Sequence, residues 1–180
     1  MIRLRSEQGY LAELRRLWLQ KESRMRLDLL WAWSTKSVWV LPKSAKLWTA
    51  RGKLAQLRYI EALKSEESRS DRVMVERMRT EIFDCFTKAI CMDPKLAEPF
   101  EELGFMYYSL IDDLDAAEAA FRRALQLKGY SRAHIGLAQV LLDQYRRSEA
   151  LRVLRKHGRS RRDARILKAV EDGKAELDWS

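Results

Sequence analysis

Residues 97–107 read AEPFEELGFMY, and residues 114–125 read LDAAEAAFRRAL. In the first stretch Phe100, Leu103 and Gly104 fall at i, i+3 and i+4, the spacing that places side chains on one side of an α-helix. The second stretch repeats small and apolar side chains at helical spacing. A pair of aspartates separates the two stretches, so the sequence predicts two antiparallel helices joined by a polar turn.

Signals before and after this helix pair mark its ends. Asp93 and Pro94 precede it, and they offer an N-cap and a residue that ends the previous helix. Gly129 follows it and favours a helix stop. Small residues at Gly104 and Ala117 would let the two helices approach closely. These signals predict a tightly packed pair with a defined start and end.

The pattern across both helices resembles the tetratricopeptide (TPR) repeat. That family places an aromatic residue, Leu-Gly and Tyr on its first helix, helix A, and Ala, an aromatic residue and Ala on its second, helix B. The matching residues here are Phe100, Leu103, Gly104, Tyr107, Ala117, Phe121 and Ala124. One extra residue lies between the two halves, and Gly129 stands where the family usually has Pro.

Weaker copies of the pattern extend the resemblance over residues 45 to about 176. The copy that precedes this helix pair in the chain ends with Phe86 and Ala89. The copy that follows it has Ala138 and Ala150 at matching positions. The resemblance implies an all-α fold, a right-handed α-solenoid of helix-turn-helix repeats. It divides the chain into an N-terminal Trp-rich helical extension (1–41), an atypical TPR-like repeat with an inserted loop near 65–71 (42–94), a TPR repeat (95–130), a TPR-like repeat (131–159), and a capping helix with a tail (160–180).

Helix A side chains line the groove in which TPR proteins hold a segment of a partner. Carried over residue by residue, the partner-binding positions are Glu98, Glu101, Phe105, Tyr108, Arg132, Ile135, Gln139 and Leu142. The first four form a second helical stripe, which points away from the packing stripe. Acidic walls favour a partner segment that carries Lys or Arg beside apolar anchors. Alternatively, residues 1–41 cover Phe105 and Tyr108, because aromatic stripes are more often core than site.

The C-terminal part of the chain is strongly basic. Only Glu149 and Asp163 oppose a run of ten basic residues, which are Arg146, Arg147, Arg152, Arg155, Lys156, Arg159, Arg161, Arg162, Arg165 and Lys168. Such density can bind the phosphates of RNA or DNA, or an anionic protein or lipid surface, although a solvated helix face gives the same pattern. Trp48 and residues 122–125 also resemble the half-a-TPR repeats of RNA-processing complexes. A nucleic-acid-associated factor or ribonucleoprotein subunit is therefore the alternative function.

Composition indicates a helix-rich globular protein, and the motifs argue against an enzyme. With 47% hydrophobic and 34% charged residues, 7 Gly and 3 Pro, the chain has the composition of a helix-rich globular protein. It contains no Gly-rich phosphate loop, nucleophile elbow or metal-binding motif. Cys85 and Cys91 fall on different faces of a helix, and His134 and His157 lack neighbouring ligand or base partners. We therefore expect no catalytic residue, no metal and no cofactor.

The remaining expectations concern location and role. No apolar run is long enough to span a membrane, no signal peptide is visible, and two cysteines favour the cytoplasm or another reducing compartment, with organelle import left open. Trp31, Trp33 and Trp39 are expected to pack within the extension rather than to lie at a membrane interface. Together these features predict an adaptor, chaperone or assembly factor that binds another protein within a larger complex.

Overall fold

A computed structural model of the chain describes residues 6–18, 23–127, 132–158 and 161–173. Among these residues the backbone forms ten α-helices and one π-helix, and no β-strand. The predicted all-α class is therefore confirmed. The chain divides into two compact units, Met1–Leu96 (unit 1) and Ala97–Ser180 (unit 2).

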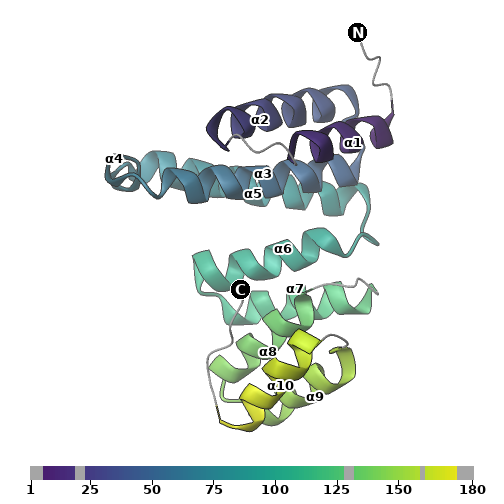
Figure 1. Cartoon of the computed structure of the whole chain (residues 1–180), viewed down its shortest axis with the longest axis vertical. Coiled ribbons are helices and arrows are strands. Elements are labelled where there is room, and N and C mark those ends of the chain that lie inside the picture. The colour runs from purple at the N-terminus through teal and green to yellow at the C-terminus, as the bar shows by residue number, and fades with distance from the viewer. Residues whose placement is uncertain (1–5, 19–22, 128–131, 159–160, 174–180) are drawn as a thin grey trace. The chain divides into compact units, whose positions relative to one another are not determined.

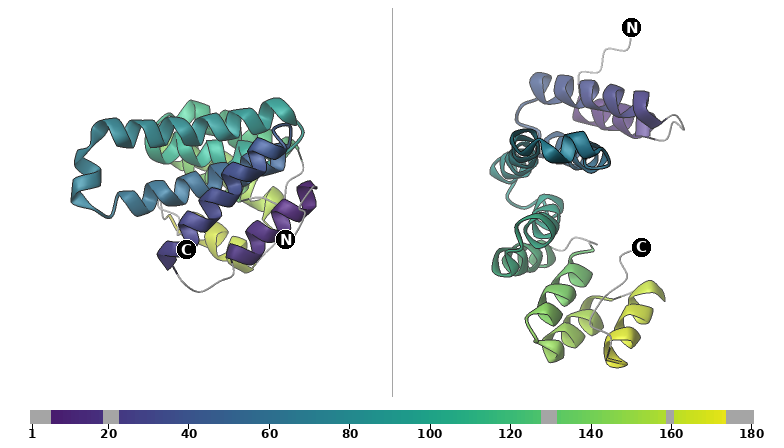
Figure 2. Two further views of the ribbon diagram at one scale, coloured as in Figure 1. Left: turned by 90° about the horizontal axis from the view of Figure 1, so that it is seen from above. Right: turned by 90° about the vertical axis from the view of Figure 1, so that its left-hand side faces the viewer.

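Unit 1 contains two helix pairs and a short connecting helix. Its elements are α1 (Glu7–Trp18), α2 (Ser23–Val40), α3 (Ala45–Ala62), α4 (Glu66–Ser70) and α5 (Arg72–Met92). The long helices α3 and α5 lie side by side with α4 at one end, and α1 and α2 pack on each other and on α3 (Figures 1 and 2). Their shared apolar core includes Tyr10, Leu14, Leu30, Val38, Leu47 and Leu54.

The stretch near 65–71, predicted as an inserted loop, contains the helix α4. The Ser65 side chain accepts a hydrogen bond from the backbone N–H of Ser68, which caps the start of α4. The Asp71 side chain accepts one from Met74 and caps α5 in the same way. Ser and Asp favour helix N-caps as strongly as they favour turns, so a polar run of these residues fits either structure.

Unit 2 stacks its helices in chain order. Its elements are α6 (Glu98–Met106), the π-helix η1 (Tyr107–Ile111), α7 (Leu114–Gln126), α8 (Ala133–Asp143), α9 (Arg147–His157) and α10 (Arg161–Glu171). Each of α6, α7, α8 and α9 packs against the helix that follows it. The buried core runs through α7, α8, α9 and α10 and includes Phe121, Leu137, Leu141, Leu154 and Val170, and partly buried side chains of α6 and η1 pack against it.

Phenylalanines packed against glycines set the helix spacing in both units. Phe121 of α7 is fully buried, and a Cβ added at Gly104 of α6 would come within 2.6 Å of its ring. A Cβ at Gly136 of α8 would come closer still, so this one ring fills the space between two helices. In unit 1, Phe86 of α5 lies against Gly52 of α3, where a Cβ would also come within 2.6 Å. Only glycine leaves room for these rings.

The π-helix η1 lies in the interval between the two helices where the sequence has one residue more than the TPR pattern. A π-turn holds more residues than an α-turn, so an insertion can be accommodated without breaking the helix. The helix ends at Asp112, which adopts a left-handed conformation with φ 59°. The Asp113 side chain then accepts a hydrogen bond from Ala116 at 2.9 Å and caps α7. Because η1 interrupts the α-helical spacing, the predicted stripe does not continue unchanged to Tyr108.

Candidate partner-binding surfaces

The predicted groove residues of unit 2 differ in exposure. They come from α6, η1, α8 and the residue before α8. Those at least partly accessible are Glu98, Phe105, Tyr108, Arg132 and Leu142. Those covered within the chain are Glu101, Ile135 and Gln139, with 6%, 3% and 4% of their surface exposed. The accessible part of the predicted surface is thus smaller than the sequence pattern indicated, and we call these five residues the α6–α8 face.

Arg132 organises the centre of this face. Its Nε lies 3.3 Å from Oε1 of Glu101, and its Nη2 lies 3.5 Å from Oε1 of Glu102. Its guanidinium also covers the Phe105 ring, 5.1 Å from the ring centroid. Phe105 in turn meets the buried ring of Phe121 edge to face, with centroids 4.9 Å apart. Although it makes these contacts, the Arg132 side chain is 60% exposed.

Sequence reasoning missed Glu102. Its side chain is only 7% exposed and shares Arg132 with Glu101. The signal available was the pair of adjacent glutamates, because buried carboxylates require a cation or hydrogen-bond donors. Helix periodicity assigned only Glu101 to the groove, since neighbouring residues on a helix point about 100° apart.

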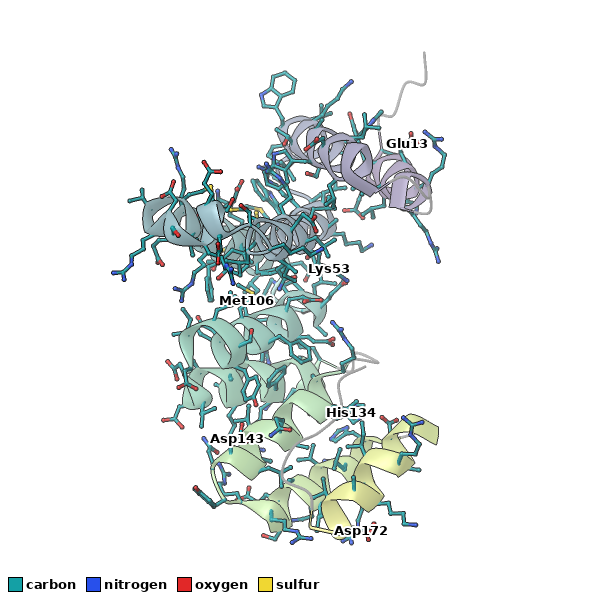
Figure 3. The ribbon with its side chains drawn as sticks, turned by 60° about the vertical axis from the view of Figure 1, so that its left-hand side comes forward. Glu13, Lys53, Met106, His134, Asp143 and Asp172 are labelled. Atoms are coloured by element: carbon teal, nitrogen blue, oxygen red, sulfur yellow. The ribbon has the colours of Figure 1, made fainter. Side chains whose placement is uncertain are left out.

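The buried groove positions serve packing on α8. Ile135 belongs to the apolar core of unit 2. The Gln139 side chain donates a hydrogen bond to Oδ1 of Asp143 at 2.8 Å. Figure 3 shows His134 and Asp143 at the two ends of α8, where both side chains make polar contacts. In this structure α8 therefore contributes chiefly Leu142 to the accessible face.

Several members of the predicted basic surface make contacts inside unit 2. Arg146 pairs with Glu118 at 2.6 Å and with both carboxylate oxygens of Glu149 at 2.8 Å. Arg147 donates to the backbone carbonyls of Val170 and Glu171 at the end of α10, and Arg155 pairs with Glu171 at 2.8 Å. The described members that are exposed are Arg147, Arg152, Arg155, Lys156, Arg165 and Lys168. Arg159 and the side chains of Arg161 and Arg162 lie outside the described part of the structure.

The Arg146 network lowers the pKa of two carboxyl groups. Burial by itself raises the pKa of Glu118, but hydrogen bonds from Arg122 and Arg146 outweigh it and the net shift is downward. The pKa of Glu149 is lowered first by its hydrogen bonds from Arg146 and then by the charges of Arg146, Arg122 and Arg152. This network joins α7 to α9.

A second surface, in unit 1, has no counterpart in the predicted site. A groove of about 830 Å³ lies between α2, α3 and α5, with Val38, Trp39, Trp48 and Lys88 among its walls. Trp39 is 82% exposed, so the expectation that it packs within the extension is wrong. Its position near the end of α2 explains this, since residue 38 faces the core and residue 39 therefore points away. Trp31 and Trp33 do pack against the core of unit 1, as expected.

The cysteine and histidine contacts that the structure describes are structural. Burial raises the pKa of the Cys85 thiol to about 11, which keeps it protonated and unreactive at neutral pH. Cys91 is exposed. His134 Nε2 lies 2.9 Å from Oδ1 of Asp163, and both residues are buried, so the pair joins α8 to α10.

Within the described residues the structure shows neither a metal site nor a membrane-spanning helix. No group of three or more His, Cys, Asp or Glu side chains within them is arranged to hold a metal ion. None of the helices within the same ranges is long and apolar enough to cross a membrane.

Comparisons with known proteins support the fold. No protein-family model matches the chain, and no curated protein does. Among solved structures, the crystal structure of a thermophilic TPR protein from Thermus thermophilus is similar, with a TM-score of 0.65 and 19% sequence identity. The match covers 91% of this chain and 88% of that one, so it reaches beyond residues 45 to 176 into the N-terminal extension. The chain therefore has a TPR-like fold.

Proposed function

We propose that this chain is a non-catalytic module that binds a segment of another protein on the α6–α8 face of unit 2. The observation that carries the proposal is the Arg132 cluster, in which an exposed guanidinium lies over Phe105 and is held by two buried carboxylates. Such a group is already ordered, so a partner that contacts it loses little further entropy from this side. The TPR-like fold supports the same class of function.

The charges of this face favour a basic partner segment. Glu101 and Glu102 lie beside Arg132, and Glu98 is exposed in the first turn of α6. A Lys or Arg of the partner would approach the acidic side chains of the face, and apolar side chains would pack on Tyr108 and Leu142. This arrangement suits an adaptor or assembly factor that holds a helix or extended segment of its client.

Affinity capture from native lysate tests this function. Wild type, Glu98→Lys and Tyr108→Ala are compared with Glu66→Lys, a matched control that makes the same charge change in the first turn of an exposed helix. We expect a protein to be retained by wild type and by the control through nuclease and about 0.5 M salt, because apolar contacts resist screening. Once identified, its binding segment is measured by calorimetry, and Glu98→Lys and Tyr108→Ala should each weaken binding about tenfold or more.

Two results would contradict the proposal. Equal binding by wild type and both variants would show that the partner docks elsewhere. Loss of every partner on nuclease treatment, together with loss on charge reversal of Arg165, would instead favour the nucleic-acid function of the basic surface.

A further inference from the structure

Unit 2 also has a groove with a positively charged rim, opposite in sign to the carboxylates of the α6–α8 face. It lies between α7 and α9, with Leu137 of α8 among its walls, and its volume is about 370 Å³. We call it the α7–α9 groove. None of its lining residues belongs to the α6–α8 face, so the proposed function makes no use of it. A groove of this volume accommodates one or two side chains of a ligand.

Two cations on the rim of this groove are available to a ligand. Arg152 and Lys156 are exposed on α9, and in the described part of the structure neither hydrogen-bonds a carboxylate. The charge of Arg152 helps to lower the pKa of Glu149, but Arg152 forms no hydrogen bond with that carboxylate. By contrast, Arg122 on the opposite wall is held by Glu118 at 2.7 Å and by Glu149 at 3.6 Å. The charge that a ligand meets is therefore positive.

The inner walls of the groove are apolar. Leu125 of α7 and Val153 of α9 are half-buried, and Leu137 of α8 is 1% exposed. A ligand that entered between α7 and α9 would reach Leu125 and Val153. The groove thus combines a cationic rim with an apolar interior, which is the usual anatomy of a site for an amphipathic segment.

We propose that the α7–α9 groove binds an acidic protein segment. A Leu or Phe of the segment enters between α7 and α9 and packs on Leu125 and Val153, while flanking Asp or Glu side chains pair with Arg152 and Lys156. Charge complementarity selects the acidic partner, and the apolar walls select one that carries an anchor. Unit 2 would then bind segments of opposite charge on two separate surfaces.

The same contacts argue against a nucleic acid as the occupant. Phosphate binding draws its strength from many cations, whereas Arg146 and Arg155 nearby are already paired within the chain. The apolar walls give a sugar-phosphate chain nothing to bury.

Fluorescence anisotropy with the full chain tests the proposal. The probe is a labelled twelve-residue peptide of Glu with two Leu, and the comparison probes are the same peptide with Ser for Leu and a twelve-nucleotide single strand. Arg152→Glu/Lys156→Glu is compared with Arg165→Glu/Lys168→Glu, which changes net charge equally at exposed positions of α10 outside the groove. Arg152→Gln/Lys156→Gln is a milder variant should the first fail to fold.

We expect the Leu peptide to bind about tenfold more tightly than the Ser peptide, because burial of the anchor contributes to affinity. The Arg152/Lys156 variants should lose about tenfold or more of that affinity, and the Arg165/Lys168 variant less than about threefold. The proposal would be overturned if the two glutamate variants lost affinity equally, or if the Leu and Ser peptides bound equally. It would also be overturned if the Leu peptide did not bind, or if the nucleic acid bound more tightly than the Leu peptide. None of these outcomes depends on the α6–α8 face.

Discussion

The groove of unit 1 and the α7–α9 groove of unit 2 are built alike but differ in chemistry. Each lies among three helices that follow one another in the stack: α2, α3 and α5 in unit 1, and α7, α8 and α9 in unit 2. The first has Trp39 and Trp48 among its walls, with three basic and two acidic side chains, whereas the second has no tryptophan and has Arg122, Arg152 and Lys156 beside Glu149. The same arrangement of helices therefore supports an aromatic surface in one unit and a cationic surface in the other.

Beneath these surfaces the two units share one packing device. Phe86 against Gly52, and Phe121 against Gly104 and Gly136, place a fully buried ring where only glycine leaves space. Packing against the ring sets the distance between helices, and it places no restriction on the side chains that face solvent. The fold of each unit thus depends on a few buried contacts, and those contacts leave the solvent-facing side chains free to vary.

Replacing the buried rings gives the largest expected effect. Phe121→Ala and Phe86→Ala should each lower the free energy of unfolding by about 3–5 kcal/mol, because both rings are fully buried. Chemical denaturation followed by circular dichroism measures both. If either variant loses less than about 1 kcal/mol, that ring does not organise its unit as described.

Adding a methyl group at the glycines should cost less. Gly104→Ala, Gly136→Ala and Gly52→Ala force the ring or the neighbouring helix to move, and overpacking of this kind costs about 1–3 kcal/mol. Combining Gly136→Ala with Phe121→Leu should recover part of the loss, because the smaller side chain makes room. If the double variant loses as much stability as the two single variants lose together, or more, direct contact between these residues is contradicted.

Acid should weaken unit 2 through its Arg146 network. The folded-state pKa values of Glu118 and Glu149 lie below the ordinary value of 4.5, so their contribution to stability is complete above that value and is lost as pH falls through the folded pKa values. The unfolding midpoint of wild type should therefore fall more steeply below about pH 4.5 than that of Glu118→Gln/Glu149→Gln. Thermal unfolding between about pH 3 and 6 checks this, and parallel curves would rule the network out as the cause.

The smallest effect is expected at the aromatic groove. Trp39→Ser should change stability by no more than about 0.5 kcal/mol, because the side chain is 82% exposed and contributes little to the core. Trp31 and Trp33, by contrast, are half-buried against the core of unit 1. Trp33→Ser is therefore the matched comparison, and it should clearly lower the free energy of unfolding. Equal loss of stability in both variants, measured by denaturation, would show that Trp39 packs after all.

Local pattern was sufficient for most of the fold. Helical spacing and the Leu-Gly and Phe signals identified Gly104, Ala117 and Phe121 as packing residues, and all three are buried. The pattern did not identify Gly136 as the second contact of Phe121, because that contact depends on the distance between neighbouring repeats rather than on spacing within one helix. Nor did it identify η1, because an extra residue can be taken up by a turn or by a π-helix.

The candidate site was less predictable than the fold. Helical periodicity shows which residues share a face, but not how much of that face other helices cover, and so Ile135 and Gln139 were expected at the surface although they are buried. The exposure of Trp39 had the same origin, since a tryptophan in an apolar run is usually core. Ion pairs such as those of Arg146 join residues far apart in sequence, so a count of basic residues cannot separate paired charges from available ones.

Site-specific photo-crosslinking is the most direct test of partner binding at the α6–α8 face. A benzophenone amino acid is placed at position 98, 108 or 142 of the face, at position 39 in the aromatic groove, or at position 66 on the exposed helix α4, and the chain is irradiated with its captured partner. We predict adducts with the same partner from positions 98, 108 and 142, and none from position 66. Adducts from position 39 or 66 alone would contradict binding at this face.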